Sequence, residues 1–207
     1  MGAKQEVRFN KRNNVTKNVL KVAKRHFWSK GFSRSRIRDI AEACGYTQGN
    51  IYNYFSSKED ILYKAILSET IDLIREIQPL ENDCDTSPVE QLRVFIEKHV
   101  ENAIGPPKGE LLQFDMEMGH LIPSHRAEIV QWRNSYDRIL RKIIRRGVDI
   151  NVFTEVNEKM VNYAISSTIL RARLWYSPQG ELSLRQISNA IFELFLNGIR
   201  SEATKNA

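Results

Sequence analysis

Hydrogen-bonding side chains crowd one face of a short helix that the sequence predicts directly after Gly45. Thr47 can cap this helix, and Ile51 and Phe55 lie one turn apart on its inner face. Amide side chains can pair with base edges, and tyrosine or threonine hydroxyls suit phosphate oxygens. The pattern therefore favours contact with nucleic acid over an ordinary solvated helix that carries two tyrosines. The outward residues are Thr47, Gln48, Gly49, Tyr52, Asn53 and Tyr54.

A second short helix is predicted immediately before the first. Ser35 is its expected N-cap, and Gly45 is its expected C-terminal stop. Its apolar residues recur at steps of three and four along one face: Ile37, Ile40, Ala41 and Cys44. Two short helices joined by a turn with glycine have the outline of a helix-turn-helix, a common DNA-binding unit.

Positive charge is concentrated around this pair of helices. Residues 1–60 hold 13 Lys or Arg against five Asp or Glu, a net charge of +8, so the other 147 residues must carry −2 to give the total of +6. Such asymmetry is typical of phosphate binding and predicts that salt weakens the complex. An anionic membrane surface is the alternative, but the basic residues do not alternate with a Trp and Leu face.

The run from Val15 to Leu67 resembles the N-terminal domain of the TetR family of bacterial transcriptional regulators. The resemblance rests on the IRDIAEACG helix and the IYNYFSSKEDIL ending, and it covers about a quarter of the chain. Ser33, Arg34 and Arg36 depart from the small or hydroxyl residues often found before the second helix, and Cys44 replaces a common alanine.

The resemblance implies roles for individual residues. The third helix would enter the major groove and present its outward residues from Thr47 to Tyr54, among which Gln48 would select the base sequence. Arg38 would reach the groove or the backbone from the second helix, and Lys58 would hold a phosphate at the start of the fourth.

Helical periodicity continues through the rest of the chain, so we predict an all-α fold of about nine helices. A stripe through Val15, Val19 and Phe27 predicts the first helix, which backs the two short ones. We expect a helix-turn-helix DNA-binding domain at residues 1–56 and a larger helical ligand-binding and dimerisation domain at 57–207. The later helices are predicted at about 57–77 with a cap at Ser56 or Ser57, at 88–104 after Ser87, and at 110–120, 124–147, 155–176 and 183–199.

Two helices near the end of the chain predict self-association. Between Ala190 and Ile199 only Glu193, Asn197 and Gly198 interrupt the apolar side chains, so the apolar surface covers more than one face. We expect this helix and the one at 155–176 to form a four-helix interface in a homodimer, which the family resemblance also implies. Two-fold symmetry then predicts a palindromic operator. The alternative is a helix buried wholly within its own chain.

The middle helices are predicted to enclose a pocket for a small, mostly apolar effector. Its expected lining is Phe95, His99, Phe114, Met118, Trp132, Tyr136, Tyr163, Ser167 and Arg171. The same aromatic residues could simply be core. Ligand binding there would shift the helix at 57–77 and move the two reading helices out of register.

The segment WYSPQGELS, from Trp175 to Ser183, resembles a TetR subgroup that senses acyl-coenzyme A thioesters in fatty acid or sterol breakdown. This resemblance assigns the acyl chain to the aromatic pocket and the coenzyme phosphates to arginines such as Arg171. A drug or another hydrophobic effector, another anion, and an interchain ion pair through Arg171 and Arg173 remain alternatives.

Other classes of function find little support in the sequence. Glu117 and His120 form one Glu-x-x-His pair, but a carboxylate di-iron site needs two, so we expect neither a metal nor a cofactor nor catalysis. No apolar run approaches the length of a bilayer span, and Cys44 and Cys84 make no disulfide framework, so a cytoplasmic location is expected. A DNA-coating protein that senses nothing is the remaining alternative.

Overall fold

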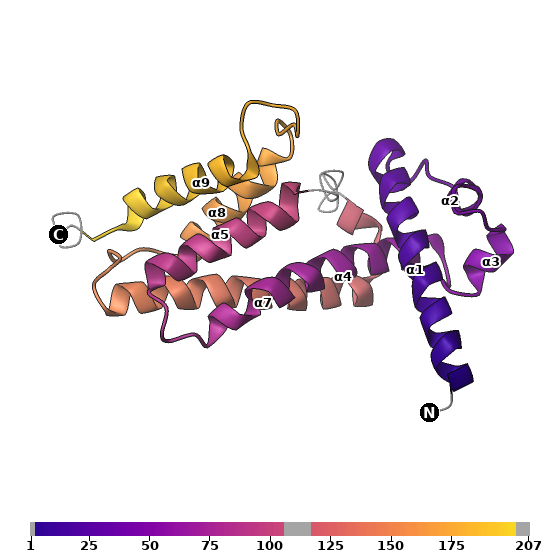
Figure 1. Ribbon diagram of the computed structural model, residues 1–207, viewed down its shortest axis with the longest axis horizontal. Coiled ribbons are helices and arrows are strands. Elements are labelled where there is room, and N and C mark those ends of the chain that lie inside the picture. Colours follow the sequence, from indigo (N-terminus) through magenta and orange to yellow (C-terminus); the bar gives the residue numbers. More distant parts are fainter. Residues whose placement is uncertain (1–2, 106–116, 202–207) are drawn as a thin grey trace. The chain divides into compact units, whose positions relative to one another are not determined.

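The computed structural model describes residues 3–105 and 117–201, and the side chains within them from residue 12 onward except that of Trp28. These residues form eight α-helices, two short 3-10 helices and one isolated antiparallel bridge between Phe153 and Arg200 (Figure 1). The predicted all-α fold is therefore confirmed. The α-helices are α1 (Ala3–Lys30), α2 (Ile37–Ala43), α3 (Gln48–Tyr52), α4 (Lys58–Ile77), α5 (Pro88–Ile104), α7 (Pro123–Asp149), α8 (Glu158–Ala172) and α9 (Leu184–Ile199), and the 3-10 helices are η1 (Gln78–Glu81) and η2 (Met118–His120).

Contacts divide the chain into two compact units. The first contains residues 1–69 and 113–129, and the second contains residues 70–112 and 130–207. The predicted division of function at residue 56 stays a prediction, because compactness does not test where each function lies. By contacts, however, the first turns of both α4 and α7 belong with α1, α2 and α3.

The first unit has its own apolar core. Val19, Ala23 and Phe27 form the buried stripe of α1, against which α2 packs. Side chains from α2 to α4 and from residues 117–129 complete the core; they include Ile40, Ile51, Phe55, Leu62, Leu121 and Ile129. Burial of this size accounts for the stability of helices as short as α2 and α3, which would be marginal alone.

The predicted N-cap at Ser35 is wrong. Arg36 precedes α2 without a capping side chain, and the Ser35 hydroxyl instead donates to the carbonyls of His26 and Gly31 at 3.0 and 2.8 Å. Ser35 is buried, so its hydroxyl needs partners within the unit, and the carbonyls at the end of α1 provide them.

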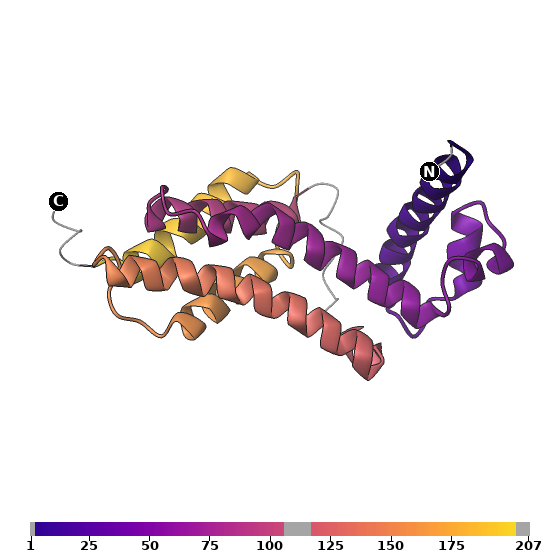
Figure 2. The ribbon, with the colours of Figure 1, turned by 90° about the horizontal axis from the view of Figure 1, so that it is seen from below.

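The second unit is a helical bundle in which α5 packs against both α8 and α9 (Figure 2). Ser87 caps α5 and Pro88 occupies its first turn, as predicted. Ser183 and Gln186 form a reciprocal capping box at the start of α9. The core contains Phe95, Leu140, Ile165, Ile169 and Phe192 among other apolar residues.

Several predicted helix boundaries shift. The helix predicted at 155–176 is α8, which begins after its cap Asn157 and ends at Ala172. The helix predicted at 124–147 continues to Asp149. The helix predicted at 110–120 lies largely outside the described residues, of which only the 3-10 turn at Met118–His120 falls in that range. No helix in the described parts of the chain is both long and apolar enough to cross a bilayer.

Candidate functional site

The turn between α2 and α3 presents α3 as the sequence predicts. Gly45 adopts the left-handed conformation with φ of 73°, which glycine tolerates without the steric cost of a side chain. The Thr47 hydroxyl accepts a hydrogen bond from the N–H of Asn50 at 3.2 Å and so caps α3. Ile51 and Phe55 are fully buried beneath it. The opposite side of α3 must therefore face solvent.

Most of the predicted DNA-contacting residues share this exposed face. Tyr52 is 48% exposed, unusually high for a large aromatic residue, and it has no structural role in the core. Tyr54 differs, because it is half-buried and packs against the core of the first unit. The exposed members are Thr47, Gln48, Gly49, Tyr52 and Asn53, and Arg38 is exposed on α2. Their contacts with DNA stay a prediction, but their placement leaves them free to make such contacts.

Arg38 projects from α2 beside this face. Its Nε lies 3.7 Å from a carboxylate oxygen of Glu42, and both side chains are more than 60% exposed. An exposed pair of this kind contributes little to stability. Its guanidinium is therefore available to a phosphate.

Lys58 lies at the start of α4, as predicted, and its ammonium is bound within the chain. Its ammonium donates to the carbonyls of Phe32 and Ser35 at 2.9 and 3.0 Å and lies 4.2 Å from the centre of the Phe32 ring. Burial lowers the pKa of Lys58, and the nearby Glu117 carboxylate acts in the opposite direction. The predicted phosphate contact is untested, yet in the DNA-free chain this lysine ties the start of α4 to the loop before α2.

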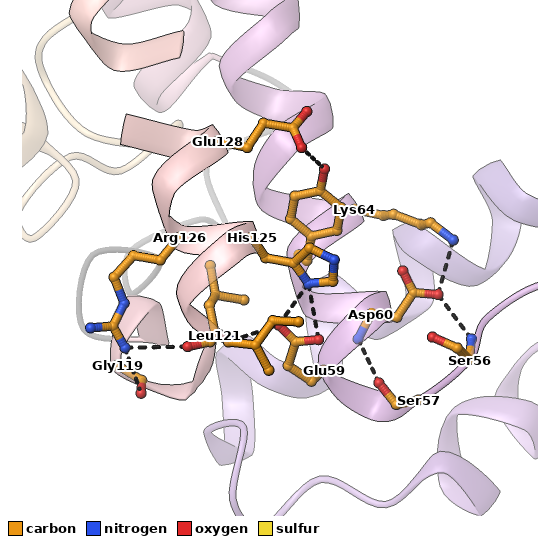
Figure 3. Close-up of polar contacts among 12 residues, drawn as sticks. Ser56, Ser57, Glu59, Asp60, Lys64, Gly119, Leu121, His125, Arg126 and Glu128 are labelled. Atoms are coloured by element: carbon orange, nitrogen blue, oxygen red, sulfur yellow. Dashed lines mark hydrogen bonds and ion pairs between the residues drawn. The ribbon is translucent and has the colours of Figure 1, made fainter. Parts of the chain in front are cut away.

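The start of α4 is held by reciprocal hydrogen bonds (Figure 3). Ser57 caps the helix by accepting from the N–H of Asp60, and Asp60 accepts from the N–H of Ser56 and from Lys64, all at 2.9 Å. Although burial opposes ionisation of Asp60, these bonds hold its pKa below the usual value. The predicted cap is confirmed, and it fixes the segment that leaves α3.

The start of α7 is bound to the same turn of α4, a contact that the sequence analysis missed. One Glu59 oxygen accepts from the N–H of Ile122 at 3.0 Å and lies 2.9 Å from Nδ1 of His125 (Figure 3). The imidazole of His125 stacks on Tyr63 with ring centres 3.8 Å apart. The sequence offered no signal for this docking, because the two segments are more than 60 residues apart.

Tyr63 makes a second link between these helices. Its hydroxyl donates to Glu128 on α7 at 2.5 Å. Burial and the acidic partner Glu128 raise the pKa of Tyr63 to about 12. The tyrosine therefore remains a neutral donor at physiological pH, and the contact is a lasting one.

The Glu-x-x-His pair is also structural. Glu117 accepts from the N–H of Phe32 at 3.1 Å, and His120 lies 3.3 Å from Glu117 and stacks on the Phe32 ring. Among the described residues, no group of three or more His, Cys, Asp or Glu could hold a metal ion. Both residues attach segment 117–120 to the loop before α2.

Part of the predicted effector pocket is a buried cluster in the second unit. Phe95, His99 and Tyr136 lie in contact, with the Phe95 and Tyr136 ring centres 4.9 Å apart, and Trp132 packs half-buried against the same core. Nδ1 of His99 lies 2.5 Å from the Tyr136 hydroxyl, to which Ser166 donates at 3.3 Å. This is a small polar centre within apolar walls.

Burial sets the charge of this centre. It lowers the pKa of His99 to about 3, with a further contribution from the positive charge of Arg173, and it raises the pKa of Tyr136 far above its usual value. The centre is therefore neutral at pH 7. Asn102, further along α5, is also buried, and its Nδ2 has no hydrogen-bond partner among the described residues, which sequence reasoning did not identify.

The remaining predicted pocket residues lie elsewhere. Tyr163, Ser167 and Arg171 are exposed on α8, because the buried positions of that helix are Asn162, Ile165, Ile169 and Ala172. Met118 packs against the core of the first unit, and Phe114 lies outside the described residues. Arg173 is half-buried and donates to the carbonyl of Ala103 at 3.0 Å.

Large apolar side chains stay exposed on α8, on the residues that follow it, and on α9. Their exposed fractions lie between 47% and 67%, and they are Met160, Tyr163, Leu174, Trp175 and Leu194. Single exposed apolar side chains are ordinary, whereas a contiguous apolar patch is typical of a surface that binds another protein.

Comparison with known protein families decides the relationship. The description "Bacterial regulatory proteins, tetR family" matches residues 19–65, and "Tetracyclin repressor-like, C-terminal domain" matches residues 85–199, more than half of the chain. The chain belongs to the TetR family. It is thus a DNA-binding transcriptional regulator, and the family is one of regulators and not of enzymes.

TetR relatives of similar length are also similar in sequence and fold. The HTH-type transcriptional repressor KstR2 of Mycolicibacterium smegmatis is 27% identical over 192 residues, which cover 91% of this chain and 93% of that protein. The crystal structure of PfmR from Thermus thermophilus is 28% identical, with a TM-score of 0.77 over 86% of this chain and 97% of that one. FadR from Bacillus subtilis, solved with stearoyl-CoA, is 24% identical, with a TM-score of 0.71 over 88% of this chain and 98% of that one.

Proposed function

We propose that this TetR family regulator is a homodimeric cytoplasmic repressor that binds a palindromic operator through α3 and leaves it on binding a small effector. The observation that carries the proposal is the set of amide and hydroxyl side chains left exposed on α3 above the buried Ile51 and Phe55. We assign DNA reading to residues 1–56 and effector binding and dimerisation to residues 57–207. A relative named as a repressor supports the direction of regulation.

Base reading and phosphate binding are assigned to different side chains. We propose that Gln48 and Asn53 pair with base edges, while the Tyr52 hydroxyl and the Arg38 guanidinium bind phosphates. Lys58 is assigned to positioning the loop before α2, since its ammonium is already bound to two carbonyls.

Competition binding tests this division. On an operator selected from genomic fragments, Gln48→Ala should change the preferred sequence, whereas Arg38→Gln should weaken binding to every sequence and lower the salt slope by about one unit. Arg185→Gln on α9 removes the same charge far along the chain and serves as the control. Equal losses on specific and scrambled DNA for Gln48→Ala would refute its reading role.

The homodimer is proposed from the exposed face of α8 and α9. Met160, Leu174 and Leu194 are each more than half exposed, and a second copy packed there would bury all three. A two-fold axis would set two copies of α3 about one helical turn of DNA apart or a small multiple of it. Sedimentation of the purified chain tests the assembly, and a monomer on DNA would contradict it.

The effector site is proposed at the buried cluster of α5, α7 and α8. Phe95, Trp132 and Tyr136 offer apolar walls, and neutral His99 with the unused Asn102 donor suits an uncharged oxygen such as a thioester carbonyl. We propose an acyl-CoA, which is the ligand solved with the Bacillus subtilis relative. Arg171, Ser167 and Tyr163 could reach such a ligand only where it extends along the exposed face of α8.

Operator release in the presence of ligand tests this site. Long-chain acyl-CoA should lower operator affinity, and Asn102→Leu should reduce that response without changing the affinity of the ligand-free protein for DNA. If no acyl-CoA releases the operator, mass spectrometry of what co-purifies would show whether another hydrophobic effector fills the site. Tight DNA binding that no small molecule relieves would favour a DNA-coating protein instead.

Release is proposed to pass through α4 and α7. Both helices begin in the first unit and continue into the second, so a ligand that displaces either one moves its first turns as well. The Glu59–His125 and Tyr63–Glu128 contacts bind these first turns to each other. In the double variant Tyr63→Phe with Glu59→Gln, acyl-CoA should release the operator less completely than from the native protein. If this effect differs from the sum of the effects of the two single variants, the two contacts act as one unit.

A further inference from the structure

A polar groove runs between α7 and α8 within the second unit. It has a volume of about 580 Å³, a size typical of sites for small molecules. None of the buried residues Phe95, His99 and Tyr136 lines it, so it is distinct from the proposed effector cluster. The five basic residues along it are Arg138, Arg141, Lys142, Arg145 and Lys159.

The groove carries an excess of positive charge. Asp137 and Glu158 are its two carboxylates, so the lining has a net charge of +3. Outside the lining, Glu81 lies 3.0 Å from Nε of Arg138 and Glu155 lies 3.6 Å from an Nη of Arg145, which leaves an excess of +1.

Glu158 is only 14% exposed and lies 3.7 Å from Nε of Arg141 and 2.5 Å from Nε of Arg145, so it draws both guanidinium groups toward the wall, although both arginine side chains are about half exposed. An arrangement with arginines drawn to one wall and surplus charge favours an anion that can accept several hydrogen bonds at once.

Two of the cations have no carboxylate to neutralise them among the described residues. Lys142 donates to the neutral side-chain oxygen of Asn82 at 3.1 Å, and Lys159 lies 5.7 Å from the centre of the Tyr163 ring. Both ammonium groups therefore retain their charge for a ligand in the groove.

A buried acceptor narrows the class of ligand. Asn162 lines the groove and is 1% exposed; its Nδ2 donates to Asp137 at 2.7 Å, while its Oδ1 has no hydrogen-bond partner among the described residues. The reverse orientation of the amide would set two oxygens against each other, so the free atom is the acceptor. A buried acceptor without a partner is costly, and a ligand with an O–H or N–H group would satisfy it.

We propose that the groove between α7 and α8 binds a phosphate ester that also carries hydroxyl or amino groups, as a nucleotide does. The phosphates meet Arg138 and Lys142, and a hydroxyl or amino group donates to Oδ1 of Asn162. A DNA backbone is the poorer fit, because its phosphodiesters and deoxyribose offer no donor to that atom. The site does not depend on what fills the effector cluster, although the nucleotide end of a coenzyme belongs to this class.

Calorimetric titration of the intact protein, in the assembly that it forms in solution, tests the groove. The probes are adenosine 3′,5′-bisphosphate and inorganic phosphate. We expect the bisphosphate to bind more tightly, and Lys142→Gln and Arg138→Gln each to weaken it about tenfold, the equivalent of one lost charge-assisted hydrogen bond. Arg185→Gln, which removes an exposed charge from α9, should leave the affinity unchanged.

The variant Asn162→Ala separates the contribution of the Asn162 acceptor to ligand affinity from the contribution of the basic side chains. It should bring the affinity for the bisphosphate close to that for phosphate while leaving phosphate binding intact. Because Asn162 is buried, its variant is compared with the native chain by thermal unfolding, and the Lys142 and Arg138 variants carry the test if it does not fold.

The remaining outcomes would overturn the proposal. Equal binding of phosphate and bisphosphate would reduce the groove to a site for adventitious ions. Displacement of the bisphosphate by short double-stranded DNA at similar concentration would make it a second DNA surface. Operator affinity of the same preparation reports separately on the proposed repressor, so loss of one function leaves the other measurable.

Discussion

Acid should destabilise the second unit through His99. The imidazole is buried in contact with Phe95 and Tyr136, and burial, aided by the charge of Arg173, lowers its pKa from 6.5 to about 3. The unfolded chain therefore binds a proton below pH 6.5, whereas the folded chain does not until about pH 3. The free energy of unfolding must then fall as the pH falls through this window.

The size of the effect follows from the same two values. At pH 7.5 neither state binds the proton, so His99 contributes no pH dependence there. A pH of 5 lies about 1.5 pH units below the pKa of the imidazole in the unfolded chain. Protonation there stabilises the unfolded state by ~2 kcal/mol relative to the folded state. A loss of that size is a large fraction of the stability of an ordinary domain.

Urea unfolding at pH 7.5 and 5.0, at one protomer concentration, measures how much unfolding free energy is lost on acidification. His99→Gln does not titrate, and its side-chain oxygen can still accept from Tyr136. On acidification the unfolding free energy of the native protein should fall by ~2 kcal/mol more than that of this variant, since all other titrating groups are common to both. The same acid loss in both proteins would refute the assignment of a buried, neutral imidazole.

Three further predictions follow from single contacts. Lys58→Met should lower the free energy of unfolding by ~2 kcal/mol, because it removes charge-assisted bonds to two carbonyls, and should leave the salt slope of operator binding unchanged; a slope reduced by about one would show a phosphate contact instead. Gly147→Ala should cost ~1–3 kcal/mol in thermal unfolding, since a Cβ there would lie 2.1 Å from the Phe153 ring; an unchanged melting temperature would contradict that close approach. Leu194→Glu should convert the proposed dimer to monomers in sedimentation, because it would bury an unpaired charge, and a persistent dimer would exclude α9 from the interface.

Local signals made the DNA-binding end of the molecule predictable. The positions of Gly45 and Thr47 and the spacing of Ile51 from Phe55 act within a few residues, so propensity and periodicity decide them without knowledge of the fold. The cap at Ser87 was predicted for the same reason, whereas the capping box at Ser183 was not predicted. The family resemblance then added the role of each residue on DNA, which stays a prediction.

The sequence could not predict which face of α8 is buried, because that depends on how the helices pack against one another. Tyr163, Ser167 and Arg171 were predicted to line the pocket because they add polar groups to an otherwise apolar helix, but α8 is rotated so that Ile165 and Ile169 face the core. A rotation of that kind depends on how α5 and α9 pack against α8. Periodicity alone does not determine it when more than one face of a helix is apolar.

The first turn of α4 explains how such distant segments can act together. Three consecutive residues there bind three different parts of the first unit. Lys58 binds the loop before α2. Glu59 binds the start of α7, and Asp60 binds Ser56, which follows the reading segment (Figure 3). Each contact joins a hydrogen-bonding side chain to a backbone group, so none can shift without leaving a polar group unpaired. A movement of either long helix must therefore be shared with the elements that present α3 or must break these bonds. This is why we expect substitutions at Glu59 to change ligand response more than they change the affinity of the ligand-free protein for DNA.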